Sequence, residues 1–208
     1  MNSMSQQFDL EGFAAPELVV PTDRLFFAIL PDPATATRIG TFTQQLSSEY
    51  GLRGRPLLAD RLHITLHHLG DFAGLPDGLV DNACQAAAKI HAAPFDVTFE
   101  RVLSFGRKSR NRPIVLLGNQ TTSGGLADLM AFQKDVYAQM CRAGLQGDKQ
   151  IARQNVHFTP HTTLLYDMNE VPEQAIEPIS WRATELVLIH SLLGKTKHIH
   201  VARWTLTA

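Results

Sequence analysis

Two short segments of the chain repeat the same pattern of chemically active residues. The pattern His-x-Thr-Leu occurs at residues 63–66 and again at residues 161–164, about half the chain length away. Each copy falls at the start of a predicted β-strand, where successive side chains alternate between the two faces. The histidine and the threonine of each copy therefore share one face, about 6–7 Å apart. The four residues are His63, Thr65, His161 and Thr163.

Two such strands lining one cleft present two imidazoles and two hydroxyls to a single ligand. One neutral imidazole can take a proton from an attacking water or hydroxyl, and the other, when protonated, can give a proton to the leaving oxygen. The threonine hydroxyls can donate hydrogen bonds to the non-bridging oxygens of a phosphate. Imidazole suits both roles because its ordinary pKa of about 6.5 allows both protonation states near neutral pH. The pattern therefore indicates acid–base catalysis on a phosphodiester.

A single His-x-Thr segment is more often structural than catalytic, so this hypothesis depends on the two copies together. His67 and His68 follow the first copy, and His63 with His67 would form a metal-binding pair if the segment were a helix. The β-branched, alternating context predicts a strand instead, where these two positions lie about 13 Å apart. No cluster of acidic or cysteine ligands accompanies them. We therefore predict neither a metal ion nor another cofactor.

Four further residues are predicted to contact the substrate. Arg112 ends a basic segment, residues 107–112, which is expected to form a hairpin loop beside the cleft and to contact phosphates. Phe105 ends the strand before this segment and can stack on a base, and Phe27 and Tyr166 are further candidates for stacking. The alternative for each aromatic residue is a place in the hydrophobic core.

Strands and helices alternate irregularly along the chain. Strands are expected at residues 25–30, 61–69, 95–105, 113–117, 161–166, 183–193 and 198–206, and helices at 33–50, 79–90 and 126–140. Asp32 as N-cap, Pro33 at the first helical position and Gly51 after the last turn delimit the first helix. Residues 144–158 are expected to form a polar loop, and residues 170–178, with two prolines, an irregular segment. The hairpins favour an α+β fold with antiparallel sheets.

Composition narrows the class of protein. The chain has 208 residues, a formal net charge of -1, 44% hydrophobic and 19% charged residues, which is typical of a globular protein. The charge excludes a globally basic nucleic-acid coat. Two cysteines cannot form a disulfide framework. Neither a membrane helix nor a signal peptide is expected, so we predict a cytoplasmic monomer without a membrane partner. Residues 1–22 are expected to form an N-terminal arm, and residues 23–208 a single domain.

These segments together resemble the two-histidine (2H) phosphoesterase superfamily, in particular its bacterial RNA 2′,3′-cyclic phosphodiesterases, also called 2′-5′ RNA ligase-type proteins. The resemblance rests on residues 24–31, 62–66, 112–118 and 160–164, and it extends over about residues 23–207. It implies a bilobal, pseudo-twofold α+β fold in which two antiparallel sheets flank a central cleft and the helices lie outside. It also implies that the four motif residues named above are the catalytic set.

The activity implied by the resemblance is metal-free hydrolysis of a 2′,3′-cyclic phosphate, at an RNA 3′ end or in a small cyclic nucleotide, to a 2′-phosphate. His161 is expected to activate water and His63 to protonate the leaving 3′ oxygen, although the pseudo-symmetric site permits the reverse. The same site can serve a 2′-5′ linkage, a nucleotide-sugar cyclic phosphate or 2′-5′ ligation. Outside the enzymes, the alternative is an RNA-binding module that retains the cleft.

Overall fold

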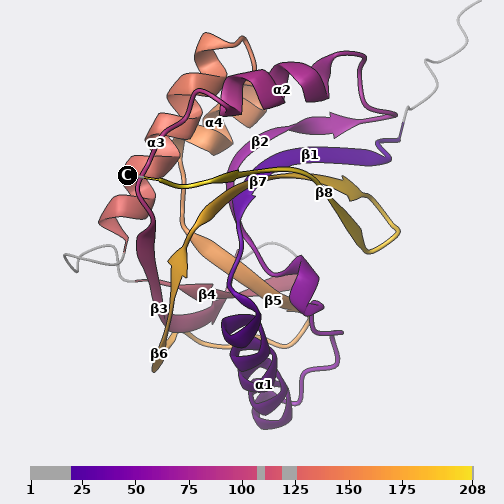
Figure 1. The fold of residues 1–208 in the computed structure, drawn as a ribbon. Coiled ribbons are helices and arrows are strands. Elements are labelled where there is room, and N and C mark those ends of the chain that lie inside the picture. Colours follow the sequence, from indigo (N-terminus) through magenta and orange to yellow (C-terminus); the bar gives the residue numbers. More distant parts are fainter. Residues whose placement is uncertain (1–19, 107–110, 119–125, 208) are drawn as a thin grey trace, which may run out of the picture.

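The computed structural model describes residues 20–106, 111–118 and 126–207. Within these ranges the strands form two four-stranded antiparallel sheets (Figure 1). Sheet A has the strand order β2-β1-β7-β8, and sheet B has the order β5-β4-β3-β6. The α+β class with antiparallel sheets, expected from the sequence, is confirmed.

The elements have the following bounds. The strands are β1 (Asp23–Ile29), β2 (Ile64–Phe72), β3 (Phe95–Ser104), β4 (Arg112–Leu117), β5 (His161–Asp167), β6 (Gln174–Ala183), β7 (Glu185–Leu192) and β8 (Lys197–Thr205). The helices are α1 (Pro33–Tyr50), α2 (Leu79–Ala87), α3 (Ala127–Arg142) and α4 (Lys149–Val156), with a short 3-10 helix, η1 (Ala59–Arg61).

Strand β1 is apolar on both faces because both faces are covered. Leu25, Phe27 and Ile29 belong to the main hydrophobic core, which contains buried residues from both sheets and from α1, α2 and α3. Phe26 and Ala28 belong instead to a small separate cluster with two residues of β7. Sheet A therefore has one face in the main core and a second face with its own apolar lining.

The helices join the two sheets into one unit. Helix α1 follows β1 of sheet A but packs against β5 and β6 of sheet B, below that sheet in Figure 1. Helix α3 follows β4 of sheet B but packs against β2 of sheet A as well as β3. Helix α4 packs on β2, and α2 packs on α3. Helix α1, which follows a strand of sheet A, thus covers part of sheet B. Helix α3, which follows a strand of sheet B, covers part of sheet A.

The ends of α1 are those predicted from the sequence. Asp32 Oδ1 accepts hydrogen bonds from the main-chain N–H groups of Ala34 and Thr35, each at 3.0 Å, and Pro33 begins the helix. Gly51 ends it with a left-handed φ of 60°, a conformation that glycine adopts without steric cost.

Two segments differ from the sequence prediction. The expected loop 144–158 contains α4, whose N-cap Asp148 accepts from the N–H of Gln150 and Ile151. The expected irregular segment 170–178 contains the first half of β6. Proline disfavours a central strand, but β6 is an edge strand, where a missing N–H is tolerated.

Two further expectations concern the chain as a whole. Most of the predicted N-terminal arm, residues 1–19, lies outside the described residues. None of the helices in the described ranges combines the length and apolar character needed to span a bilayer.

Candidate active site

The two His-x-Thr-Leu segments lie on corresponding strands of the two sheets. One precedes and enters β2, an edge strand of sheet A, and the other begins β5, an edge strand of sheet B. These two strands contact each other, so the segments meet across the boundary between the sheets. A cavity of about 500 Å³ lies at this place. It is lined by all four predicted catalytic residues, His63, Thr65, His161 and Thr163.

Each motif strand contains a bulge at the motif leucine. The pairing of β1 with β2 skips Leu66, and the pairing of β4 with β5 skips Leu164. A bulge inserts one extra residue and so exchanges the faces of the residues that follow it. The fifth residue after each motif histidine therefore returns to the cavity side, and these residues, His68 and Tyr166, both line the cavity. Strict alternation would have placed the buried His67 there instead.

The two motif imidazoles are held by identical hydrogen bonds. His63 Nδ1 lies 2.7 Å from the carbonyl oxygen of Arg61, and His161 Nδ1 lies 2.7 Å from that of Thr159. A carbonyl oxygen can only accept, so Nδ1 carries the hydrogen in both rings. In the neutral imidazoles, Nε2 is then the nitrogen that can accept a proton from a ligand.

Burial keeps both imidazoles neutral in the free protein. Burial is the main cause, the neighbouring His161 and the positive charges of Arg61 and Arg24 add to it, and together, against the Arg61 carbonyl, which raises the pKa, they lower the pKa of His63 to about 4. Burial also lowers the pKa of His161, against the bond to Thr159. Both rings are therefore poised to take up a proton only when an anion or a reacting group favours it.

Aromatic side chains fix the orientation of the two rings. The Phe26 ring centroid lies 5.0 Å from that of His63, and the Phe105 centroid lies 5.0 Å from that of His161. The ring of His198 packs edge-on against His63 at 5.2 Å. Such packing restricts ring rotation, so the Nε2 atoms are presented in defined directions.

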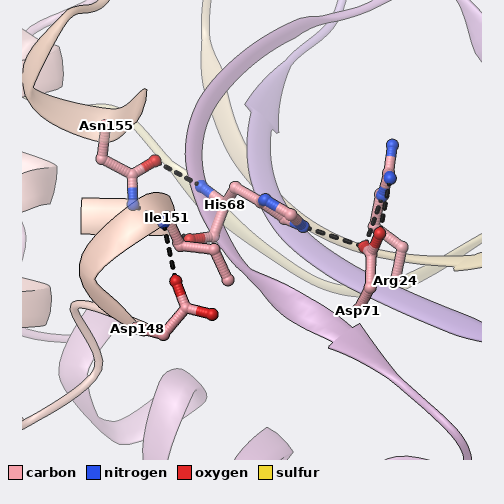
Figure 2. A network of polar contacts seen from close by, with 6 residues as sticks. All are labelled: Arg24, His68, Asp71, Asp148, Ile151 and Asn155. Carbon is pink, nitrogen blue, oxygen red and sulfur yellow. Dashed lines mark hydrogen bonds and ion pairs between the residues drawn. The ribbon is translucent and has the colours of Figure 1, made fainter. Parts of the chain in front are cut away.

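A polar network reaches the cavity from both sides of β2 (Figure 2). The Arg24 guanidinium donates two hydrogen bonds of 2.6 Å to Asp71, and His68 Nε2 lies 3.0 Å from the same carboxylate. Asn155 accepts from the His68 N–H at 2.9 Å and donates to its carbonyl at 3.0 Å. Since β2 is an edge strand, the Asn155 amide satisfies main-chain groups that have no neighbouring strand. The network therefore fixes the strand that carries Thr65.

Of the four predicted substrate contacts, one lines the cavity and another lies beside it. Tyr166 lines it, with 47% of its surface exposed. Phe105 contacts the His161 ring and so lies beside the site, in contact with one of its histidines.

The other two predicted contacts lie elsewhere. Phe27 is fully buried in the main core, and Phe26 is the residue of β1 that lines the cavity. The sequence prediction named Phe27 instead of Phe26 because, in a continuous run of apolar residues, the two faces of a strand cannot be told apart by alternating polarity. Arg112 begins β4, and its guanidinium pairs with Glu170 rather than lining the cavity. Residues 107–110 of the expected basic hairpin lie outside the described residues.

His198 lies in the site but is not among the site residues predicted from the sequence. Its ring contacts His63 and Phe26 and lines the cavity, whereas Trp204 of the same strand contacts Phe27 in the main core. The pairing of β7 with β8 skips Val201, so the two ends of β8 present opposite faces. The imidazole of His198 was the only indication of its role in the sequence. The bulge that turns this side chain toward the cavity cannot be recognised from the sequence.

Comparison with known proteins agrees with this arrangement. The family model described as LigT like Phosphoesterase matches residues 29–115. The RNA 2′,3′-cyclic phosphodiesterase of Escherichia coli (strain K12) is 30% identical over 189 residues, which cover 88% of this chain and 97% of the relative.

Solved structures show the same similarity. The crystal structure of E. coli LigT in apo form matches with a TM-score of 0.67 and 26% identity, over 91% of this chain and 100% of that chain. LigT complexed with 3′-AMP matches over the same shares with a TM-score of 0.63 and 25% identity. A protein of Thermus thermophilus, TT0787, matches in fold, with a TM-score of 0.67 and 16% identity, over 88% of this chain and 97% of that chain.

The two His-x-Thr-Leu strands, the paired sheets and the near full-length similarity to the E. coli relative point to one assignment. The chain belongs to the LigT-like phosphoesterases, within the two-histidine phosphoesterases.

Proposed function

We propose that this protein hydrolyses nucleoside 2′,3′-cyclic phosphates, at RNA 3′ ends or in small cyclic nucleotides, to 2′-phosphates without a metal ion. The observation that carries the proposal is the matched pair of imidazoles, His63 and His161, on one cavity. In each, a main-chain carbonyl holds Nδ1 and leaves Nε2 for proton transfer. Two opposed proton-transfer groups are what attack and departure at a phosphorus atom require. The E. coli relative, named for RNA 2′,3′-cyclic phosphodiesterase activity, supports the substrate class.

The proposed step uses the four motif residues. His161 Nε2 takes a proton from water as the water oxygen bonds to phosphorus. The bond between phosphorus and O3′ breaks, and protonated His63 gives its Nε2 proton to O3′, which leaves a 2′-phosphate. Thr65 and Thr163 donate hydrogen bonds to the non-bridging oxygens, where negative charge increases in the transition state.

The assigned role of His63 as the acid requires the bound substrate. Arg61 and Arg24 add positive charge on its side of the cavity and lower its pKa, which disfavours the protonated ring in the free protein. The anionic cyclic phosphate favours the protonated ring once it is bound.

Hydrolysis of a 2′,3′-cyclic mononucleotide in the presence of EDTA tests the proposal. His63→Ala and His161→Ala should each lower kcat by about 10²–10⁴-fold and leave the melting temperature close to that of the wild type. His91→Ala, at an exposed histidine outside the cavity wall, is the matched control and should keep full activity. Wild-type turnover in both motif variants contradicts the proposal. Binding of cyclic-phosphate RNA by the wild type without hydrolysis would support an RNA-binding module instead.

The assignment of acid and base can be tested with a modified substrate. A cyclic phosphorothiolate with sulfur in place of O3′ has a leaving group that needs no proton. His63→Ala should then regain most of the lost rate, whereas His161→Ala should not. The opposite result would exchange the two roles.

A further inference from the structure

The cavity wall is rich in nitrogen groups and carries an unbalanced charge. Within the described residues, two arginines and five histidines line it, and no aspartate or glutamate does. Asp71 neutralises Arg24. Arg61 forms no ion pair with any residue that the structure describes. One positive charge of the wall is therefore not balanced by these residues.

Arg61 lies next to His198. It is the last residue of η1, which contacts β8, the strand that carries His198. Arg61 Nε and His198 Nδ1 are both buried and have no hydrogen-bond partner in the described part of the chain. Buried polar atoms are nearly always hydrogen-bonded. Two such atoms in residues that line one cavity point to a polar group of the ligand at this place.

Among the residues that the structure describes, the cavity wall on the His161 side has no equivalent charge. Thr159 stands before His161 as Arg61 stands before His63, and both carbonyls accept the same kind of bond. The side chains differ, since one is a hydroxyl and the other a guanidinium. A cyclic phosphate carries one negative charge and faces two similar sets of imidazole and hydroxyl. The added cation on one side therefore fits a second anionic group of the substrate.

We propose that Arg61 and His198 bind a second phosphate of the substrate, the phosphate on the 5′ oxygen of the terminal ribose. This rests on the proposed function, which places a 2′,3′-cyclic phosphate on the same ribose. A guanidinium binds phosphate through several N–H donors, and a neutral imidazole can add one more. A cavity of about 500 Å³ falls in the range that holds a ligand of nucleotide size.

Three substrates with the same base and the same cyclic phosphate test this subsite. They are adenosine 2′,3′-cyclic phosphate, the same nucleotide with a 5′-phosphate, and a diadenosine dinucleotide ending in the cyclic phosphate. The wild type should show a kcat/KM about tenfold higher for at least one of the two substrates with a 5′-phosphate. A gain with the dinucleotide identifies RNA 3′ ends as substrates, and a gain only with the free 5′-phosphate identifies small nucleotides. Equal values for all three overturn the proposal.

Two variants assign the preference to these residues. Arg61→Gln removes the charge, and His198→Phe removes the ring nitrogens but keeps a ring against Phe26 and His63. Each should abolish most of the preference, so that the ratio of kcat/KM with a 5′-phosphate to kcat/KM without one falls from about tenfold toward one, whatever the variant does to the rate on the plain mononucleotide. Equal losses on all three substrates would mean a structural role and overturn the proposal. Arg182→Gln, which removes an exposed guanidinium paired with Asp96, is the control and should keep the preference.

A binding measurement separates this proposal from the proposed function. If none of the three substrates is hydrolysed, the proposed function fails, but the subsite is still tested by calorimetry with adenosine 2′-phosphate and adenosine 2′,5′-bisphosphate. The bisphosphate should bind wild type about tenfold more tightly and with a steeper salt dependence. Arg61→Gln should bind the two ligands alike. Equal affinities in the wild type overturn the subsite whatever the catalytic result.

Discussion

Thr162 and Thr163 are neighbours in β5 but face opposite sides of the sheet. Thr163 lines the cavity. Thr162 is fully buried, and its hydroxyl has no hydrogen-bond partner among the described residues. The same amino acid therefore occurs once at the candidate site and once in the interior, next to each other.

This pair allows a matched test of the motif hydroxyls. Thr163→Val keeps the shape of the side chain but removes the donor, and it should lower kcat/KM by about 10–100-fold. Thr65→Val should have a similar effect. Thr162→Val should leave kcat/KM unchanged and keep or raise the melting temperature, because it removes an unsatisfied buried hydroxyl. Equal activity of the Thr162 and Thr163 variants would contradict the role of the hydroxyls.

The pH dependence of the reaction should reflect the buried imidazoles. Burial lowers the pKa of His63 to about 4 and also lowers that of His161. Since kcat/KM reports the free enzyme, its bell-shaped profile should have a maximum below pH about 6.5. Bound phosphate favours the charged rings, so the maximum of kcat should lie at a higher pH.

The acidic and the basic limb of this pH profile report the titration of His63 and His161 as a coupled pair rather than of either ring alone. Unfolding should be followed by circular dichroism over the same pH range, so that loss of structure is not mistaken for loss of the active protonation state. A maximum of kcat/KM above pH about 8 would mean that these imidazoles are not the titrating groups.

Stability at acid pH should depend on His67. This ring is fully buried, its Nε2 lies 2.9 Å from the Leu145 carbonyl oxygen, and burial lowers its pKa to about 4. The unfolded chain takes up a proton below pH about 6.5, whereas the folded chain does so only near pH 4. The contribution of neutral His67 to the free energy of unfolding is therefore fully present above pH about 6.5. As the pH falls from there toward 4, the free energy of unfolding decreases by up to about 3 kcal/mol.

The substitution His67→Gln keeps an amide donor for the Leu145 carbonyl but cannot titrate. Its free energy of unfolding, measured in urea, should change less between pH about 7.5 and about 5 than that of the wild type. His91→Gln, at an exposed histidine, should leave the wild-type pH dependence intact. An unchanged pH dependence in the His67 variant would show that this ring is not the group responsible.

Gly54 should be intolerant of a side chain. A Cβ atom at this position would lie 1.9 Å from the carbonyl oxygen of Tyr166, and the N–H of Gly54 bonds to Asp167 at 2.5 Å. Gly54→Ala must therefore push its segment away from β5, and it should lower stability by about 2 kcal/mol or more.

Gly40 provides the contrasting case. It lies inside α1, and a Cβ there meets nothing within 4 Å. Gly40→Ala should raise stability by up to about 1 kcal/mol because alanine favours the helix. Thermal denaturation of both variants checks the pair. A Gly54→Ala protein that melts at or above the wild-type temperature would refute the close contact with β5.

Those features of the structure that depend only on neighbouring residues in the chain could be predicted from the local sequence pattern. The cap of α1 at Asp32 and Pro33 involves residues within one helical turn, and so it can be read from the sequence. The pairing of His63 with Thr65, and of His161 with Thr163, depends only on the two-residue period of a strand. The repeat of this pattern predicted a shared cleft, and together with residues 24–31 and 112–118 it carried the resemblance to the family.

The tertiary structure decided which other side chains join that site. Bulges at Leu66, Leu164 and Val201 exchange the faces of the residues beyond them, and a bulge arises from pairing between strands rather than from one strand alone. His68 and His198 consequently reach the cavity. The choice of Phe26 over Phe27 likewise depends on which face of sheet A meets the main core, and this follows from the packing of segments far apart in the chain.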